Sequence, residues 1–129
     1  MVQYDHLANL LNHLVNSRKV RKSKCEFRPF NKLMLAVLKV MEKNGYIKKF
    51  EGVKDSRGGV IKIELGNLNF CKAIKPRFNV KKGGFNKYTR RFLPARNFGI
   101  IIVSTNKGIL THKEAVEKDL GGRLLAYCY

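Results

Sequence analysis

The chain has 129 residues, of which 44% are hydrophobic, so it can bury a core and is not a disordered basic tail. Its 27 Lys and Arg against 9 Asp and Glu give a net charge of +18, and an anionic partner would relieve this self-repulsion. Nucleic acid fits better than a membrane, because no predicted helix is strongly basic on one face and strongly apolar on the other. There is no signal-like apolar run and no stretch of about 18 apolar residues, so we expect a cytosolic protein without a membrane partner.

The chain begins with an amphipathic helix. Leucines recur at helical spacing over residues 4–17 and form one apolar stripe. Five Lys and Arg follow within residues 18–24, which indicates a cluster that faces phosphate groups. Residues 25–29 predict a short strand.

A second helix and a hairpin complete the first half. Asn31 stands where a helix N-cap belongs, and apolar residues recur at helical spacing over residues 32–44. Gly45 suits the left-handed position that ends such a helix. Residues 46–53 and 60–65 predict two strands joined by a turn that is rich in Gly, Ser and Asp. The first half therefore has the predicted order α-β-α-β-β.

The second half is predicted to be mainly strands. A boundary is expected at Gly66-Asn67, which gives an N-terminal α+β domain over 1–66 and a C-terminal β-rich domain over 67–129, where the candidate RNA contacts described below are concentrated. Thr111 and Glu114 form a capping-box pattern that starts a short helix. The other elements expected here are strands over 70–74, 77–80, 99–104 and 123–129, with a short helix over 86–92. The predicted fold class is α+β with two small domains.

The pattern of His and Cys does not indicate an enzyme. His6 and His13 lie two turns apart on one helix without a third ligand, so we expect no metal and no cofactor. Three cysteines without C-x-x-C spacing are typical of buried thiols in a reducing compartment. A hydrolase would need His112 beside Cys71 or Cys128, whereas His112 is expected on the surface or in the capping turn. No phosphate-binding glycine motif is present, and no small-molecule substrate is expected.

One polar loop is the first candidate RNA contact. It follows the apolar strand over 99–104 and consists of Ser104, Thr105, Asn106, Lys107 and Gly108. Short hydroxyl and amide groups fit the shallow minor groove of RNA and reach 2′-hydroxyls, and a lysine can neutralise a phosphate. An ordinary Ser/Thr/Asn turn explains the same composition equally well.

Arginines beside aromatic residues form the second candidate contact. No Asp or Glu lies between Glu64 and Glu114, and this interval includes Arg77, Arg91 and Arg96. Arginine can bind phosphates and stack on unpaired bases. We expect these three arginines on RNA, with the neighbouring residues Phe78, Phe92 and Phe98 mostly in the core.

Several motifs in order resemble the ribosomal protein S8 family of the small subunit, in its archaeal and eukaryotic branch. The resemblance covers nearly the whole chain and is strongest at Ser104–Ile109, His112, Glu114-Ala115 and Gly121-Gly122. The other matching segments are Asp5, Leu7-Ala8, Leu11–Asn16, Lys32, Asn44–Ile47, Lys75–Phe78, Leu93–Arg96 and Phe98-Gly99.

The resemblance implies a two-domain α+β protein that binds the central domain of small-subunit rRNA directly and acts early in assembly. It implies that the loop with Ser104, Thr105 and Lys107 is the main RNA contact, and that Asn16 and Lys32 lie near RNA. Neighbouring small-subunit ribosomal proteins are the other partners implied. From their positions in basic segments, the remaining candidate RNA-binding residues are Arg18, Lys19 and Asn31.

This chain departs from the family pattern at three positions. Asn106 and Asn31 stand where the family often has Ser, and both keep a polar hydrogen-bonding group. Arg123 follows the double glycine where bacterial members usually have Glu, so no acidic contact is expected there. A free regulator that binds a messenger RNA could carry the same residues and stays the alternative function.

Overall fold

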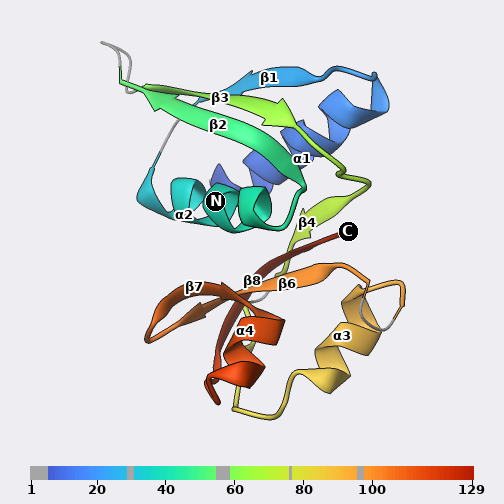
Figure 1. The fold of residues 1–129 in the computed structure, drawn as a ribbon, viewed down its shortest axis with the longest axis vertical. Helices are drawn as coiled ribbons and strands as arrows, with labels where there is room; N and C mark the ends of the chain where they lie inside the picture. The colour runs from blue at the N-terminus through green and yellow to red at the C-terminus, as the bar shows by residue number, and fades with distance from the viewer. Residues whose placement is uncertain (1–5, 29–30, 55–58, 76, 96–97) are drawn as a thin grey trace, which may run out of the picture. The chain divides into compact units, whose positions relative to one another are not determined.

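A computed structural model describes residues 6–28, 31–54, 59–75, 77–95 and 98–129. The chain forms two compact units, Met1–Cys71 and Lys72–Tyr129, and Figure 1 labels their elements. Helices and antiparallel sheets occur together, which confirms the α+β fold class. Among the described helices, none has the length and apolar character needed to cross a bilayer.

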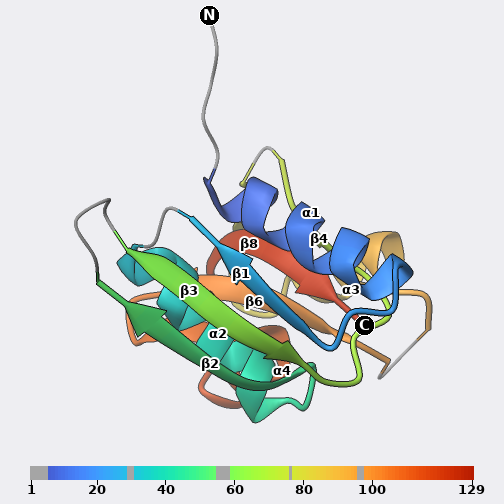
Figure 2. The same ribbon diagram turned by 90° about the horizontal axis from the view of Figure 1, so that it is seen from above.

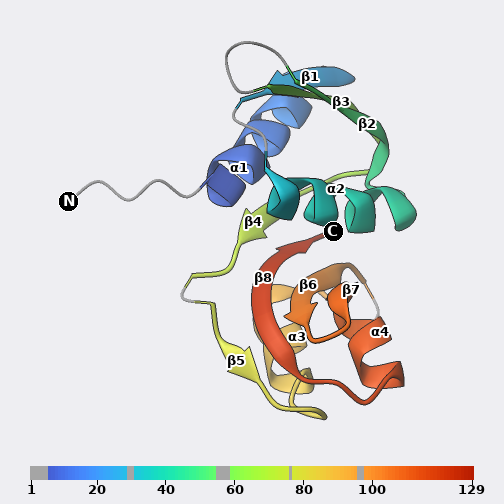
Figure 3. The ribbon, with the colours of Figure 1, turned by 90° about the vertical axis from the view of Figure 1, so that its left-hand side faces the viewer.

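The first unit has the predicted order of elements. These are α1 (His6–Lys19), β1 (Lys24–Phe27), α2 (Lys32–Lys43), β2 (Ile47–Val53) and β3 (Val60–Leu65). The strands form an antiparallel sheet in the order β1-β3-β2. Figure 3 shows both helices on one face of this sheet, and their apolar stripes supply buried residues such as Leu10, Leu14 and Met41.

Helix α1 runs two residues beyond its predicted end, through Arg18 and Lys19. Both are good helix formers, and their charges favour the negative end of the helix dipole. The chain then leaves the helix through Arg21, whose φ of 60° lies in the left-handed region. The Lys22 N–H bonds to the Ser17 carbonyl at 2.9 Å, which closes the last turn.

Both predicted ends of α2 are confirmed. The Asn31 side-chain oxygen accepts a hydrogen bond from the Met34 N–H at 2.9 Å, as an N-cap does. Gly45 ends the helix with a φ of +84°, which a glycine adopts without strain.

The first unit includes the residues just beyond Gly66. The Gly66 N–H donates to the Tyr46 carbonyl, and a Cβ at Gly66 would lie 3.1 Å from the Tyr46 carbonyl carbon. Leu68 is fully buried. These contacts place the end of this unit at Cys71, while the division into domains 1–66 and 67–129 stays a prediction.

The second unit is built on a sheet in the order β4-β8-β6-β7, with β5 paired to β8. Its elements are β4 (Cys71–Ala73), β5 (Asn79–Val80), α3 (Asn86–Phe92), β6 (Ile100–Thr105), β7 (Gly108–Thr111), α4 (His112–Glu117) and β8 (Gly122–Cys128). Ile101, Val103 and Leu124 of the sheet pack with Ala115 of α4 in one buried cluster. Thr111 accepts a hydrogen bond from the Glu114 N–H, which confirms the predicted cap of α4.

Strand β7 was not expected, because residues 108–111 carry no clear alternation of apolar and polar side chains. It forms through its register with β6, where Ile102 pairs with Thr111 and Thr105 with Gly108. The predicted strand over 77–80 shortens to Asn79–Val80, and Pro76, expected to interrupt the chain there, lies outside the described residues.

His112 is expected on the surface or in the capping turn, and the structure has it in the capping turn, directly after the N-cap Thr111, but not on the surface. His112 is 8% exposed, and its Nδ1 accepts a hydrogen bond from the Ile101 N–H at 3.1 Å. Ile101 pairs with Tyr127 of β8 on one side, but β7 pairs with β6 only from Ile102 onward, so on the other side the imidazole takes the place of a β7 partner. A buried backbone N–H needs such an acceptor.

Candidate nucleic-acid interface

The polar loop is the tip of the β6–β7 hairpin. Ile100–Val103 are buried, and the strand reaches the surface at Ser104 and Thr105. Because Thr105 pairs with Gly108, the turn consists of Asn106 and Lys107 alone. The polar loop predicted over 104–108 is therefore longer than the turn that the structure has, since Ser104, Thr105 and Gly108 belong to the paired strands. We call Ser104–Gly108 the hairpin tip from here on.

The Thr105 hydroxyl fixes the turn. It donates a hydrogen bond to the Gly108 carbonyl at 2.8 Å and accepts one from the Lys107 N–H at 3.1 Å. A threonine hydroxyl has one donor hydrogen and two acceptor positions. One acceptor position therefore remains for a ligand, so Thr105 can meet an RNA 2′-hydroxyl only as an acceptor while the turn is intact. Lys107 and Asn106 are exposed beside it.

Ser104 lies on the other face of β6 from Thr105, since side chains alternate along a strand. It is half-buried and pairs across the sheet with Arg123 of β8. The Arg123 Nε donates to the Asn79 Oδ1 at 3.3 Å, which holds the guanidinium in place. Arg123 was not among the predicted RNA-binding residues, because its partner Ser104 lies far away in the sequence and only the strand register joins them.

Glycine allows the two strands to approach each other behind the tip. A Cβ at Gly122 would clash with the Ser104 carbonyl oxygen and lie 2.7 Å from Val103 Cγ1. A Cβ at Gly121 would lie 2.9 Å from the Lys82 backbone nitrogen. Gly122 therefore lets β8 and Arg123 lie close to the hairpin, and Gly121 lets the chain before β8 pass close to the residues around β5.

Aromatic rings hold one of the predicted arginines. The Arg91 guanidinium lies 5.3 Å from the Phe78 ring and 5.3 Å from the Phe92 ring. These phenylalanines are half-buried, and Phe98 is 48% exposed, so the expectation that all three lie mostly in the core is wrong for Phe98 and too strong for the others. Arg77 is exposed.

Arg96, the third arginine predicted to bind RNA in this stretch, lies outside the described residues.

The structure does not bring the first-unit candidates together. Helices α1 and α2 run in the same direction on their face of the sheet (Figures 1 and 2). Asn16, Arg18 and Lys19 are near the end of α1, whereas Asn31 and Lys32 begin α2, so the two groups lie at opposite ends of the helical layer.

Two of these side chains also have structural partners. The Arg18 Nε donates to the Leu68 carbonyl at 3.0 Å, which ties α1 to the segment after β3. The Asn31 oxygen caps α2, which leaves its amide N–H groups for a ligand. Asn16, Lys19 and Lys32 are exposed.

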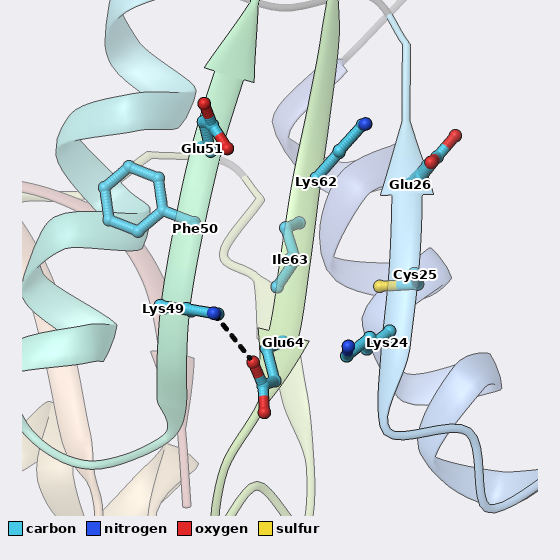
Figure 4. A pocket seen from close by; sticks show the side chains of 9 residues that line it. All are labelled: Lys24, Cys25, Glu26, Lys49, Phe50, Glu51, Lys62, Ile63 and Glu64. Atoms are coloured by element: carbon cyan, nitrogen blue, oxygen red, sulfur yellow. Dashed lines mark ion pairs between the residues drawn. The ribbon is translucent and has the colours of Figure 1, made fainter.

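The outer face of the β1-β3-β2 sheet carries a balanced set of charges. Lys24 and Lys49 both pair across the sheet with Glu64, and Glu26 and Glu51 both pair with Lys62. Figure 4 shows these side chains around a shallow depression of about 600 Å³, with the ion pair between Lys49 Nζ and Glu64 Oε2 at 3.7 Å. We call these six residues the balanced sheet face. Because its charges cancel, it offers little attraction to a polyanion.

The buried thiol and imidazole are unsuited to nucleophilic catalysis. Burial raises the pKa of the Cys71 thiol to about 12, and its Sγ donates to the Leu11 carbonyl. Burial, with a smaller effect of the Lys113 charge, lowers the pKa of His112 to about 4, while the bond from Ile101 occupies Nδ1. A thiol that stays protonated is a poor nucleophile. Among the described residues, no group of three or more His, Cys, Asp and Glu could hold a metal ion.

The comparison with known families agrees with this geometry. The family model described as Ribosomal protein S8 matches residues 5–129 of the chain. The match spans both units and includes the hairpin tip, the balanced sheet face and every described residue named above.

Proposed function

Since the chain belongs to the ribosomal protein S8 family, rRNA-binding proteins of the small ribosomal subunit, we propose that it binds the central domain of small-subunit rRNA through the hairpin tip. In this role it supports assembly of the subunit and translation, contacts neighbouring ribosomal proteins and works in the cytoplasm without catalysing a reaction. Membership of the archaeal and eukaryotic branch is part of the same proposal.

The observation that carries this proposal is the way the hairpin tip is held. A buried strand supports it, a two-residue turn closes it, and the Thr105 hydroxyl bonds to both sides of that turn. Polar groups that are already fixed lose little conformational freedom when they bind. The Ser104 hydroxyl, the free acceptor position of Thr105 and the Asn106 amide can then read 2′-hydroxyls and base edges, which distinguishes RNA from DNA.

The other predicted contacts belong to the same proposal, with differing roles. Lys107 and Arg77 would neutralise phosphates, since both are exposed cations. Gly108, with a φ of +108°, lets the backbone turn at the point where RNA approaches. The first-unit candidates Asn16, Lys19 and Lys32 would meet RNA from two ends of the helical layer, and Arg18 and Asn31 would assist them through the groups that their structural bonds leave free. Arg91 and Arg96 complete the predicted set.

The test compares two substitutions at one position. Thr105→Ala removes the turn bonds and the remaining acceptor, whereas Thr105→Ser keeps a hydroxyl. We expect Thr105→Ala to weaken binding to small-subunit rRNA by about 1–3 kcal/mol, as the loss of a specific contact does, with Thr105→Ser close to the parent. The dissociation constant is measured on purified rRNA at moderate salt, with circular dichroism as a check on folding. Equal affinity of the alanine variant and the parent would remove the hairpin tip from the interface.

Co-sedimentation with small subunits separates this role from that of a free regulator of a messenger RNA. A ribosomal protein travels with the subunit at physiological salt, and sequencing of RNA crosslinked in cells identifies the segment that it touches. Crosslinks confined to messenger RNA would contradict the proposal.

A further inference from the structure

Helix α3 carries cations on the side of the second unit opposite the hairpin tip. Lys87, Arg90 and Arg91 are all exposed, and the helix contains no acidic residue. It lies in the stretch between Glu64 and Glu114, where no residue is Asp or Glu. The feature is therefore a local excess of positive charge on a regular element.

A row of aromatic rings supports these cations. Tyr88 lies 5.6 Å from Phe78 and 6.5 Å from Phe92, and Phe92 lies 5.2 Å from Tyr127, between ring centroids. All four rings are half-buried and pack against the core cluster of the second unit. We call them the aromatic row. Because they are fixed to the core, they are a firm base for any side chain that rests on them.

Two of the three cations rest on this row. Arg91 lies over Phe78 and Phe92, and the Lys87 Nζ lies 5.7 Å from the Tyr88 ring. A guanidinium whose flat face covers a ring keeps the N–H donors at its edge available. Within the described residues, Arg91 donates no hydrogen bond to a protein acceptor. Its fork of donors is held in place without a carboxylate partner.

Helix α3 and the hairpin tip are at opposite ends of β6. The helix is followed by Leu93 and the bridge between Ala95 and Phe98, which lead into the start of the strand, and the tip follows its end. Figures 1 and 2 both show α3 and the β6–β7 turn on opposite sides of this unit. Five steps of about 3.3 Å along β6 separate the two by roughly 17 Å, too far for one phosphate to meet both.

We propose that Lys87 and Arg91, which rest on the aromatic row, form a second RNA-binding surface with the neighbouring Arg90. This surface binds phosphate groups of an RNA segment other than the one at the hairpin tip. The inference rests on the proposed rRNA binding and deepens it, because Arg91, one of the contacts proposed there, becomes part of a surface together with Lys87 and Arg90. RNA is the partner that the charges favour, since a planar guanidinium fork matches phosphate oxygens and the surface lacks acidic residues. Two contacts on one compact unit raise the affinity through effective concentration.

The experiment uses the full chain and small-subunit rRNA. The double variant Arg90→Ala, Arg91→Ala should lower the salt slope of binding by about two and weaken affinity roughly tenfold at physiological salt. The matched control is Lys118→Ala, an exposed cation at the end of α4 in the same unit, which should leave the slope unchanged. An unchanged slope in the double variant, or an equal fall in the control, would overturn the inference.

Footprinting shows whether the two surfaces meet different RNA. Hydroxyl-radical protection should disappear from one segment in the α3 double variant and from another in Lys107→Ala. If Lys107→Ala loses protection and the α3 variant does not, only this inference fails. If neither variant loses protection, the proposed function fails as well.

Arg91→Lys separates charge from geometry and guards against misfolding. It keeps the positive charge but loses the planar fork, so the salt slope should match the parent while the affinity falls severalfold. Full affinity in this variant would mean that only the charge of Arg91 matters, and it would contradict the proposed role of the aromatic row in holding the guanidinium. Thermal unfolding of each variant establishes that the second unit is intact.

Discussion

The balanced sheet face and helix α3 both display cations on regular, well-supported elements, yet they differ in what faces those cations. On the sheet, Lys24, Lys49 and Lys62 each have a glutamate directly across a strand. On α3, Lys87 and Arg91 lie over aromatic rings, and the helix has no acidic residue. The number of basic residues is similar in the two places, but only α3 has charge to offer a polyanion.

This difference shows how a chain with a net charge of +18 can still have a side that RNA does not favour. The balanced sheet face holds three of the chain's 9 acidic residues in a small area. Cross-strand pairs of opposite charge contribute roughly 0.2–1 kcal/mol each to stability. Here their larger effect is to cancel the local electrostatic field, so we expect RNA to bind surfaces without carboxylates.

The largest expected effect concerns the support of the hairpin tip. Gly122→Ala would place a methyl group against the Ser104 carbonyl oxygen and Val103. We therefore expect overpacking to lower the free energy of unfolding by about 3 kcal/mol, and we expect RNA binding to be lost as well. Gly83→Ala is the control, since its φ is +77° but no atom lies within 4 Å of the added Cβ; it should cost about 1 kcal/mol. Chemical denaturation measures both, and equal losses would mean that β8 does not need this close approach.

The second expected effect is a loss of stability at low pH in the second unit. Burial lowers the pKa of His112 to about 4 from an unfolded value near 6.5, so the unfolded chain binds the proton first as the pH falls. We expect the second unit to lose on the order of 1–2 kcal/mol between pH 6.5 and 4, allowing for partial solvent screening.

Nuclear magnetic resonance can follow amides of β6 and β3 separately during this titration. The native signals of the β6 amides should decrease at a higher pH than those of β3. His112→Phe should remove this pH dependence above pH 5, although it lowers stability overall. If the β6 signals of the parent chain and of the His112→Phe variant change with pH in the same way, a group other than His112 causes the effect.

The third prediction tests the comparison directly with one lysine from each region. Lys107→Ala should lower the salt slope of rRNA binding by about one, because we propose that this exposed cation binds a phosphate. Lys62→Ala should leave the slope unchanged and cost less than about 1 kcal/mol of stability, since it only leaves Glu26 and Glu51 without their partner. Similar slopes in the two variants would show that the balanced sheet face also binds RNA.

The smallest expected effect is a gain. Arg21 has a left-handed φ of 60°, which costs a non-glycine residue about 1 kcal/mol, so Arg21→Gly should raise the stability of the first unit by roughly 0.5–1 kcal/mol. Unlike Lys62, Arg21 has no ion pair with an acidic residue in the part of the chain that the structure describes, so we also expect weaker rRNA binding. Thermal unfolding and a binding titration on the same sample decide; a loss of stability would show that the strain is relieved by contacts of the arginine side chain.

Local signals in the sequence determined much of this protein. Apolar spacing predicted α1 and α2, Asn31 and Thr111 marked helix starts, and Gly45 marked a helix end, because caps and periodicity depend on neighbouring residues alone. The motif order also indicated the family that the match over residues 5–129 shows. The polar composition of the hairpin tip was visible as well, although its strand β7 was not.

Only the tertiary structure decided which basic side chains lie beside a glutamate and which remain available to bind an anion. Lys62 and Arg91 look alike in the sequence, but strand register places glutamates beside the first and packing places phenylalanine rings beneath the second. Register likewise joins Arg123 to Ser104 and puts His112 beside the Ile101 N–H. These pairings join residues from separate elements, and no local pattern encodes them, because the electrostatic field at a side chain depends on what lies within a few ångströms in space.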